Sequence, residues 1–390
     1  MNTYSMLRRR SHALVAASAF LTAACSDDNK DVSPRFDEAA LRADVETVQK
    51  TADIVGVLAE VVTPEGPLRA RAGAAELGTN QPVPWDAHFR VASTTKTFVA
   101  TVVLQLVGEG KLSLEDPVEK WLPGVVRGQG NDGNKVTVRQ LLQHTSGLFD
   151  YVEDEGLQSA MRQDFEGIRY NLMTPEELVA IAMKHPPAFA PGQGWSYSNT
   201  GYLVAGMIIK AITGHDWSHE VVNRIAVPLG LTQTSVTTTD PKVPVPYART
   251  YLRVEGAPSP LETTENTLEH TADSAVISTT ADLNRFFREL VTGKVLRASE
   301  LTEMQRTVPM PEGDYPAGTR AGLGIFWSPT SCGGFWQHAG DSPVAPHTRT
   351  GITADGRRSI IVSMTSTVDF ASTDRAVFEL TERALCDRAR

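Results

Sequence analysis

The chain has 390 residues, and the 41% that are hydrophobic suffice for a large buried core in one elaborate domain or two ordinary ones. Its formal net charge is -9, which leaves no basic surplus to hold a phosphate backbone. Nucleic acid is therefore not an expected partner.

The first residues follow an export pattern. A basic run at residues 8–10 precedes an uncharged stretch at residues 13–24, which is followed by a polar segment. This order is typical of a signal peptide over residues 1–24, and the uncharged stretch is too short for a permanent transmembrane helix. We expect an extracytoplasmic protein whose folded domain, residues 37–390, follows a polar tether at residues 25–36.

The end of this export pattern contains a cysteine. Thr22-Ala23-Ala24-Cys25 resembles a bacterial lipoprotein signal, although Leu21 lies four residues before Cys25 and not the usual three. Lipidation of Cys25 predicts a membrane-anchored lipoprotein, whereas ordinary cleavage nearby predicts a secreted protein. The lipid is the membrane contact that we expect.

Two further cysteines, Cys332 and Cys386, remain once Cys25 is set aside. An exported protein folds in an oxidising compartment, where thiols that lie close together form disulfides. We therefore expect a disulfide between Cys332 and Cys386, with two buried free thiols as the alternative.

The folded domain begins with a predicted helix and strand. Leu41, Val45 and Val48 recur at helical spacing within residues 36–50. Residues 54–62 form a β-branched run that ends at a turn, which favours a strand.

Two apolar segments predict buried helices. Nearly every turn of residues 94–109 is apolar all round, and Gly108 and Gly110 mark its end. The second segment covers residues 200–213 and stops at Gly214. Both helices are expected in the core.

The remaining segments divide into a helical and a strand-rich part. Residues 111–270 show helical patterns broken by loops and no strand alternation. Strand-like runs return at residues 335–337 and 359–364, and residues 373–386 predict an amphipathic helix. Strands near both ends of the chain must then share one sheet, with the helical part inserted.

Ser93 and Lys96 are three residues apart at the start of the first buried helix, so their side chains lie on one face. A lysine held against an apolar helix loses its charge more readily than one in water and can act as a base for a serine nucleophile. A helix-capping serine beside a solvated lysine is the alternative.

The loop before the second buried helix reads Ser196-Tyr197-Ser198-Asn199-Thr200. A tyrosine there can relay protons, and an asparagine amide can hold a substrate amide by a donor and an acceptor. A capping cluster is the structural alternative for this segment.

A third element, His338-Ala339-Gly340, ends a predicted strand. His338 can face a cleft there, and Gly340 allows a substrate backbone to approach the strand edge. Taken alone, such a histidine is more often a polar surface residue.

These three elements follow the order and separation of the motifs of penicillin-recognising serine enzymes. The chain resembles serine D-alanyl-D-alanine carboxypeptidases of the group related to class C β-lactamases, whose second motif is Tyr-x-Asn. The resemblance covers the chain from about Leu41 to its C-terminus. The further segments that carry it are Val91-Ala92-Ser93-Thr94-Thr95-Lys96-Thr97-Phe98, Leu141-Leu142-Gln143-His144-Thr145-Ser146-Gly147-Leu148 and Phe189-Ala190-Pro191-Gly192-Gln193-Gly194-Trp195-Ser196-Tyr197-Ser198-Asn199.

The resemblance implies a β-lactamase/transpeptidase-like fold of the α/β (α+β) class. Its antiparallel five-stranded sheet is flanked by terminal helices, and a mostly helical subdomain is inserted. The sheet part should cover about residues 37–110 and 275–390, and the helical part about residues 111–274.

The resemblance also implies the roles of the site residues. Ser93 attacks a carbonyl, Lys96 and Tyr197 take its proton, and Tyr197 returns a proton to the leaving amine before water hydrolyses the acyl-enzyme. The N–H groups of Ser93 and Asp341 form the oxyanion hole. The implied substrate-binding residues are Asn199, His338, Gly340 and Asp341. No metal or cofactor is expected.

Two competing signals are weak. His215 and His219 have the spacing of a helical zinc site but lack the glutamate that follows the first histidine of metalloproteases, so we interpret them as a helix-start pair. No Gly-x-Ser-x-Gly sequence occurs, which argues against an α/β-hydrolase.

The chain departs from the carboxypeptidase pattern after the third motif. Enzymes of that group usually bind the substrate's terminal carboxylate with a hydroxyl and an arginine. Here Asp341-Ser342-Pro343-Val344 follows Gly340, and the strand at residues 324–328 contains no arginine. A substrate carboxylate beside Asp341 would meet repulsion unless another cation reaches the site.

A second departure adds further acidic groups. Ala272-Asp273-Ser274-Ala275 replaces small residues and glycine, and Glu269 lies just upstream. We therefore hypothesise a substrate that lacks a free C-terminal carboxylate or carries an amine.

The leading interpretation is an extracytoplasmic, monomeric D-alanyl-D-alanine carboxypeptidase-like peptidase that acts on a peptide or other small acyl substrate, such as a cell-wall peptide, and is acylated by β-lactams. Alternatives on the same fold are a β-lactamase, an esterase and a D-aminopeptidase or amidase. From a different class, the chain could be a catalytically silent binder of wall fragments or β-lactams.

Overall fold

A computed structural model describes residues 36–386 except 52, 254–258, 312–315, 343, 345 and 367–369, and it gives the backbone but not the side chains of residues 370–372. The predicted signal peptide, Cys25 and the tether up to residue 35 lie outside the described residues. Phe36 is buried and packs with Leu41 and Val45 of the first helix. No helix within the described ranges is long and apolar enough to cross a bilayer.

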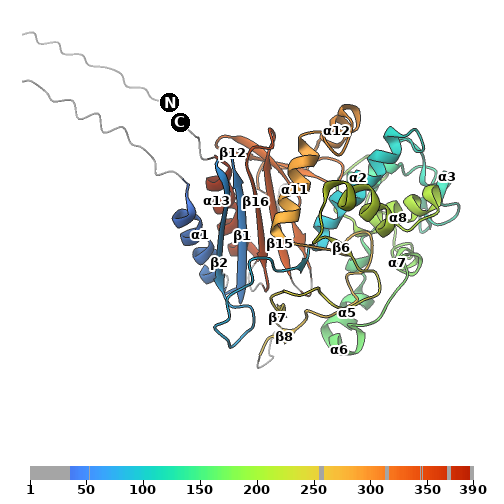
Figure 1. The fold of residues 1–390 in the computed structure, drawn as a ribbon. Coiled ribbons are helices and arrows are strands. Elements are labelled where there is room, and N and C mark those ends of the chain that lie inside the picture. Colours follow the sequence, from blue (N-terminus) through green and yellow to red (C-terminus); the bar gives the residue numbers. More distant parts are fainter. Residues whose placement is uncertain are drawn as a thin grey trace, which may run out of the picture. The chain divides into compact units, whose positions relative to one another are not determined.

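One antiparallel sheet carries strands from both ends of the chain, as predicted (Figure 1). The strand order is β10-β11-β12-β13-β15-β16-β1-β2, and β14 pairs with β15 beside this path. The strands are β1 (Gly56–Thr63), β2 (Gly66–Gly73), β10 (Val308–Pro309), β11 (Arg320–Ala321), β12 (Phe326–Thr330), β13 (Gly333–Gln337), β14 (Gly340–Asp341), β15 (His347–Thr353) and β16 (Ser359–Met364).

The number of strands differs from the expected five. Within the part of the chain that the structure describes, the sheet has nine strands, and β10, β11 and β14 have two residues each. A two-residue strand is too short to show the alternation of apolar and polar residues by which a strand is recognised in a sequence. Pairing with neighbouring strands stabilises these short strands, and their own sequences do not indicate them.

Helices cover both faces of this sheet. The terminal helices α1 (Glu38–Thr51) and α13 (Phe370–Cys386) contact each other and one face, and α11 (Thr280–Val291) lies on the other face (Figure 1). The burial of β16 on both faces explains this arrangement: Ile360 and Val362 pack with the terminal helices, and Ile361 packs into the core on the side of α11. Successive side chains of a strand point to opposite faces, so one apolar run serves two cores.

The inserted part is mostly helical, and its core contains the two buried helices. These are α2 (Thr95–Gly108) and α8 (Asn199–Thr213), which contact each other. The helix α8 ends at Gly214, whose φ of 76° is the left-handed conformation that glycine adopts without strain. The other helices are α3 (Val118–Trp121), α4 (Val138–Leu142), η2 (Tyr151–Glu153), α5 (Glu155–Gln163), α6 (Phe165–Ile168), α7 (Pro175–Ala182), α9 (Trp217–Val221), η3 (Val222–Ala226), α10 (Val227–Leu229) and, after the insertion, α12 (Ala298–Met304).

Short strands accompany these helices, and the sequence patterns did not predict them. They are β4 (Arg127–Gly128), which pairs with β5 (Asn131–Asp132), and β7 (Tyr251–Leu252), which pairs with β8 (Leu261–Glu262). A further small sheet has the order β3-β9-β6, formed by β3 (Phe89–Arg90), β9 (Val276–Ser278) and β6 (Ser235–Val236). This sheet brings the residues before Ser93 next to those after Asp273.

The predicted disulfide between Cys332 and Cys386 is confirmed, with an S–S distance of 2.03 Å. It ties the turn between β12 and β13 to the last turn of α13. The bridge closes a loop with a sequence separation of 54 residues, and such a cross-link restricts the unfolded chain.

Cys386→Ser is expected to lower the free energy of unfolding by about 4 kcal/mol, because it releases that loop in the unfolded state. Urea denaturation measures the change. Cys332→Ser should cause the same loss, and the double substitution should cost no more than either single one. An unchanged denaturation midpoint in Cys386→Ser would show that the bridge contributes nothing to stability.

Candidate active site

Ser93 lies in a tight turn between β3 and α2, and not in the first turn of the α-helix as the sequence suggested. The residues Ala92–Thr94 form the 3-10 turn η1, and Ala92 has a φ of 47°. A residue with a Cβ costs roughly 1–2 kcal/mol in this left-handed conformation. The surrounding structure must therefore hold the turn, because the turn itself is strained.

Strand β14 supplies part of that support. A Cβ at Gly340 would lie 2.1 Å from the Val91 carbonyl oxygen and 3.1 Å from Thr94 Oγ1. Thr94 Oγ1 also donates to the His338 carbonyl at 3.2 Å. Glycine is thus needed at position 340 because β14 lies against the turn that contains Ser93. The predicted approach of a substrate backbone at Gly340 stays a prediction. The contact places Asp341 next to that turn.

Lys96 is fully buried and points toward Ser93. Its Nζ donates to Ser93 Oγ at 3.0 Å, to Asn199 Oδ1 at 2.6 Å and to the Asp273 carbonyl oxygen at 2.9 Å. The Tyr197 ring centroid lies 5.0 Å from the same nitrogen. The structure therefore brings Ser93, Lys96, Tyr197 and Asn199 into one cluster, as the motif order predicted.

Burial lowers the pKa of Lys96 from 10.5 to about 8, although the carboxylates of Asp273 and Asp150 act in the opposite direction. A fraction of the amine is then neutral near pH 7. In that state the contact with Ser93 can reverse, so that the hydroxyl donates to Nζ. A neutral amine at 3.0 Å from Ser93 Oγ is in position to take the serine proton.

We expect kcat/KM to rise as the pH passes upward through about 8, because Lys96 is protonated below that pKa and can act as a base above it. An activated ester without ionisable groups isolates this titration from that of the substrate. A profile that stays flat between about pH 7 and 9 after subtraction of spontaneous hydrolysis would contradict the assignment.

The His144 ring packs against the Tyr197 ring, a contact that the sequence did not reveal. The His144 ring is buried and stacks on the Tyr197 ring with centroids 4.3 Å apart. His144 Nδ1 accepts the Ser198 backbone N–H at 3.1 Å, which places the proton on Nε2. Burial lowers the pKa of His144 well below its usual value, so the ring is neutral. The signal available in the sequence was the His144-Thr145-Ser146-Gly147 segment.

Asn199 connects Lys96 to a half-buried acid, Asp150. It is the first residue of α8, and its Nδ2 donates to Asp150 Oδ2 at 2.8 Å. Burial raises the pKa of Asp150 to about 7, so its carboxyl titrates near neutrality. Both ends of the Asn199 amide thus have partners within the protein.

A second acid flanks the lysine from the segment after the helical insertion. Asp273 is buried, and its Oδ2 accepts from Tyr151 Oη at 3.0 Å while Thr271 binds the other oxygen. Its carbonyl oxygen is the third acceptor of Lys96. Lys96 therefore has two carboxyl groups nearby, those of the half-buried Asp150 and the buried Asp273.

His338 is buried and uncharged. Its Nδ1 donates to the Ala339 carbonyl oxygen at 2.6 Å, which leaves Nε2 as an acceptor with no hydrogen-bond partner among the described residues. Burial and the nearby Lys96 charge lower the pKa of His338 to about 3. Its free acceptor atom suits a substrate N–H or O–H group and not an anion.

Asp341 binds an arginine, Arg349, and no pattern in the sequence indicated this contact. Asp341 Oδ1 accepts from His347 Nδ1 at 2.8 Å and from Arg349 Nη1 at 2.7 Å, both on β15. Burial alone would raise the pKa of Asp341, but Arg349 and His347 outweigh it and lower the pKa to about 2. Arg349 also binds Asp374, so its charge is already compensated by two carboxylates.

Glu269 adds a further acid, a buried one, next to the third motif. Its carboxyl bonds to the side chain of Ser342, which follows Asp341, and its Oε2 has no hydrogen-bond partner among the described residues. Burial raises the pKa of Glu269 to about 7, while Arg90 acts in the opposite direction. The expected acidic surroundings thus consist of Glu269, Asp150 and Asp273.

Ser93 is hydrogen-bonded to a buried lysine whose pKa is lowered, and a tyrosine and an asparagine reach this pair from the start of a second buried helix. This arrangement defines a serine hydrolase of the penicillin-recognising class. Residues 41–383 match the Beta-lactamase family, and the chain belongs to this family.

Solved structures of similar proteins support the fold over nearly their whole length. A D-stereospecific amidohydrolase from Streptomyces sp. is 37% identical, with a TM-score of 0.81 over 88% of this chain and 99% of that one. A D-amino acid amidase from Ochrobactrum anthropi SV3 is 27% identical, with a TM-score of 0.76 over 88% of this chain and 97% of that one.

The similarity to curated relatives is less extensive. Esterase EstB from Burkholderia gladioli is 34% identical over 53% of this chain and 52% of the esterase. The matched part of the chain spans about half or less of the length of the curated relatives that it matches.

Proposed function

We propose that the chain hydrolyses the amide bond of small D-amino-acid derivatives that carry a free amine and no free C-terminal carboxylate, through an acyl-enzyme on Ser93. This proposal refines the serine hydrolase class of the family. The observation that carries it is the distribution of charge around the site.

That charge favours a cationic substrate over an anionic one. The carboxyl groups of Asp273 and Glu269 are buried, and that of Asp150 is half-buried, near Lys96 and the third motif. Those of Asp150 and Glu269, with pKa values of about 7, are partly ionised at neutral pH. The cation that approaches the third motif, Arg349, is already bound by two aspartates. A substrate carboxylate would compete with these acids for few cations, whereas a substrate ammonium would gain by its attraction to them.

The similar structures support the same substrate class. One of the two similar structures is a D-stereospecific amidohydrolase, and the other is a D-amino acid amidase. Both are similar to this chain over at least 97% of their own length. An esterase among the relatives is consistent with the same chemistry, because an ester and an amide form the same acyl-enzyme.

The proposed reaction uses the cluster as follows. Ser93 Oγ attacks the amide carbon while its proton passes to Lys96 or Tyr197, and the carbonyl oxygen becomes an anion held by the N–H groups of Ser93 and Asp341. The tetrahedral intermediate collapses, and the leaving nitrogen takes a proton from Tyr197. Water then attacks the acyl-enzyme and gives one proton to the base. The second tetrahedral intermediate collapses by breaking its bond to Ser93 Oγ, the base returns the proton to that oxygen, and the free acid leaves.

Steady-state hydrolysis of matched substrates tests the proposal. D-Phenylalanine amide, its L enantiomer, N-acetyl-D-phenylalanine amide, a D-Ala-D-Ala peptide and the C-terminal amide of that peptide are compared, with Ser93→Ala as background. We expect D-phenylalanine amide to exceed its N-acetyl derivative by about tenfold or more in kcat/KM, which corresponds to about 1.4 kcal/mol.

The competing outcome is the D-alanyl-D-alanine carboxypeptidase activity that the motif order predicts. A clear preference for the D-Ala-D-Ala free acid over its amide would overturn the amidase proposal and favour the carboxypeptidase. Equal kcat/KM values for D-phenylalanine amide and its N-acetyl derivative would show that the acidic residues do not attract the substrate ammonium.

We also propose that the protein acts outside the cytoplasm, secreted or anchored through Cys25. The export pattern of residues 1–24 supports this, and so does the Cys332–Cys386 disulfide, since such bridges are rare in the cytosol. Globomycin-sensitive processing with partition into membranes would favour the lipoprotein. Complete recovery from the soluble secreted fraction would contradict the anchor.

A further inference from the structure

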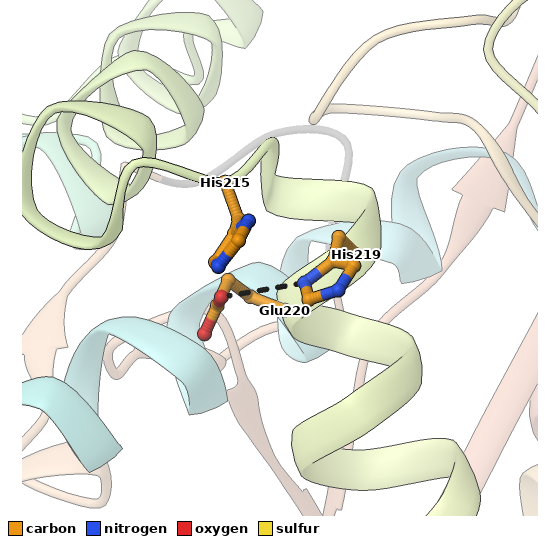
Figure 2. Close-up of side chains that lie close together, drawn as sticks. All are labelled: His215, His219 and Glu220. Carbon is orange, nitrogen blue, oxygen red and sulfur yellow. Dashed lines mark ion pairs between the residues drawn. The ribbon is translucent and has the colours of Figure 1, made fainter.

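Two histidines meet where α8 ends and α9 begins, on the surface of the helical part. His215 follows the end of α8, and His219 lies in α9 four residues later. Their rings stack with centroids 4.4 Å apart (Figure 2). The sequence favoured a helix-start pair because the metalloprotease glutamate is missing between them. The fold adds a third candidate ligand, Glu220.

Glu220 faces this pair. Its Oε1 lies 3.5 Å from His219 Nδ1, and Figure 2 shows its carboxylate pointing toward both rings. One ligand atom from each of His215, His219 and Glu220 lies within 4.8 Å of the others. We propose that these three residues form a binding site for a divalent transition-metal ion such as Zn²⁺, with water completing its coordination.

The three ligand atoms need to move only slightly closer together to bind one ion. Three atoms at the corners of a 4.8 Å triangle have a centre about 2.8 Å from each, whereas Zn²⁺ takes nitrogen and oxygen ligands at about 2.0–2.2 Å. Both imidazoles are exposed, so rotation of their side chains can close this gap without moving the backbone. Imidazole and carboxylate are also the ligand types that this class of ion prefers.

Neighbouring residues fix the carboxylate. The Glu220 side chain is only 7% exposed, and its Oε2 bonds to Arg224 Nε, while Arg224 also pairs with Glu109. This leaves Oε1 directed at His219. Such outer contacts orient a metal-binding carboxylate. The site therefore combines one fixed ligand with two adjustable ones.

The site is separate from the nucleophile. Asn199 opens the 15-residue helix α8, and His215 follows its other end, which puts them about 20 Å apart at 1.5 Å per residue. The helix α9 contacts both α2 and α8. An ion bound to His215, which follows α8, and to His219 in α9 would therefore fix the junction between α8 and α9. The ion has a structural role in this proposal and takes no part in hydrolysis.

The test uses the untagged chain, freed of metal with EDTA and titrated with ZnCl₂ by calorimetry and thermal unfolding. We expect one Zn²⁺ per chain and a melting temperature that rises with zinc. His215→Ala and His219→Ala should each weaken binding by about tenfold or more, and Glu220→Gln should weaken it less. His185→Ala, which removes a different histidine, should bind zinc as the unmodified chain does.

Two results would overturn the site. One is an absence of heat and of thermal shift at up to about 1 mM zinc, the weak end of protein affinities. The other is equal zinc binding by the unmodified chain and by the double variant of His215 and His219. Circular dichroism of each variant checks that the fold is retained.

Discussion

Ser93→Ala is expected to lower kcat/KM by about 10⁴-fold or more for any amide or ester substrate, because it removes the atom that forms the acyl-enzyme. Ser93 Oγ bonds to Lys96 Nζ at 3.0 Å in a turn held by Gly340, so the nucleophile and its base are already in position. The small side chain of alanine fits the same turn, and the loss should appear in kcat without a change in stability. Steady-state kinetics on an activated ester measure it.

Ser299→Ala is the matched control, since it makes the same chemical change at an exposed serine in α12. It should retain full activity. If Ser93→Ala kept more than about a hundredth of the original rate, the covalent mechanism would have to be abandoned.

Lys96→Met is expected to lower kcat by about 10³-fold, within the range that a positioned general base contributes. Methionine has a similar length and suits the buried position, so the fold should persist. The variant should also lose the rise in rate through about pH 8 that the Lys96 titration predicts. Lys96→Arg is an instructive companion, because it keeps the charge but cannot give up a proton near neutrality.

The Lys96→Met result has a clear contrary outcome. If the variant retained the pH dependence of the unmodified chain, another group would have to be the base. The same variant removes the cation next to Asp150 and Asp273, so the pKa of Asp150 should rise further above its present value of about 7. NMR titration of the carboxyl groups follows that change.

Segments with long apolar runs could be predicted from the sequence. The apolar helices at residues 94–109 and 200–213 differ from α2 and α8 by one residue or so at their ends, because burial on all sides leaves few alternatives. The β-branched run at residues 359–364 is β16 itself. The disulfide was predicted from the number of cysteines and from the expectation of an oxidising compartment.

Features that depend on strand pairing, on local backbone geometry or on an unfamiliar motif spacing could not be predicted from the sequence. Arg349 lies eight residues after Asp341 on another strand, and only the antiparallel pairing of β14 with β15 brings them together. Ala92 gives no sign of its left-handed backbone, because alanine seldom adopts it. Glu220 was missed as a partner of the histidine pair because the known zinc motifs place the glutamate elsewhere.

The central claim, that Ser93 forms a covalent acyl-enzyme, is tested most directly by mass spectrometry of the intact chain and its peptides after exposure to penicillin and to an activated ester. The account predicts a single adduct on the peptide that contains Ser93, and no such adduct in Ser93→Ala. Absence of an adduct with both reagents, or an adduct on another residue, would contradict it, and the first of these would favour a silent binder.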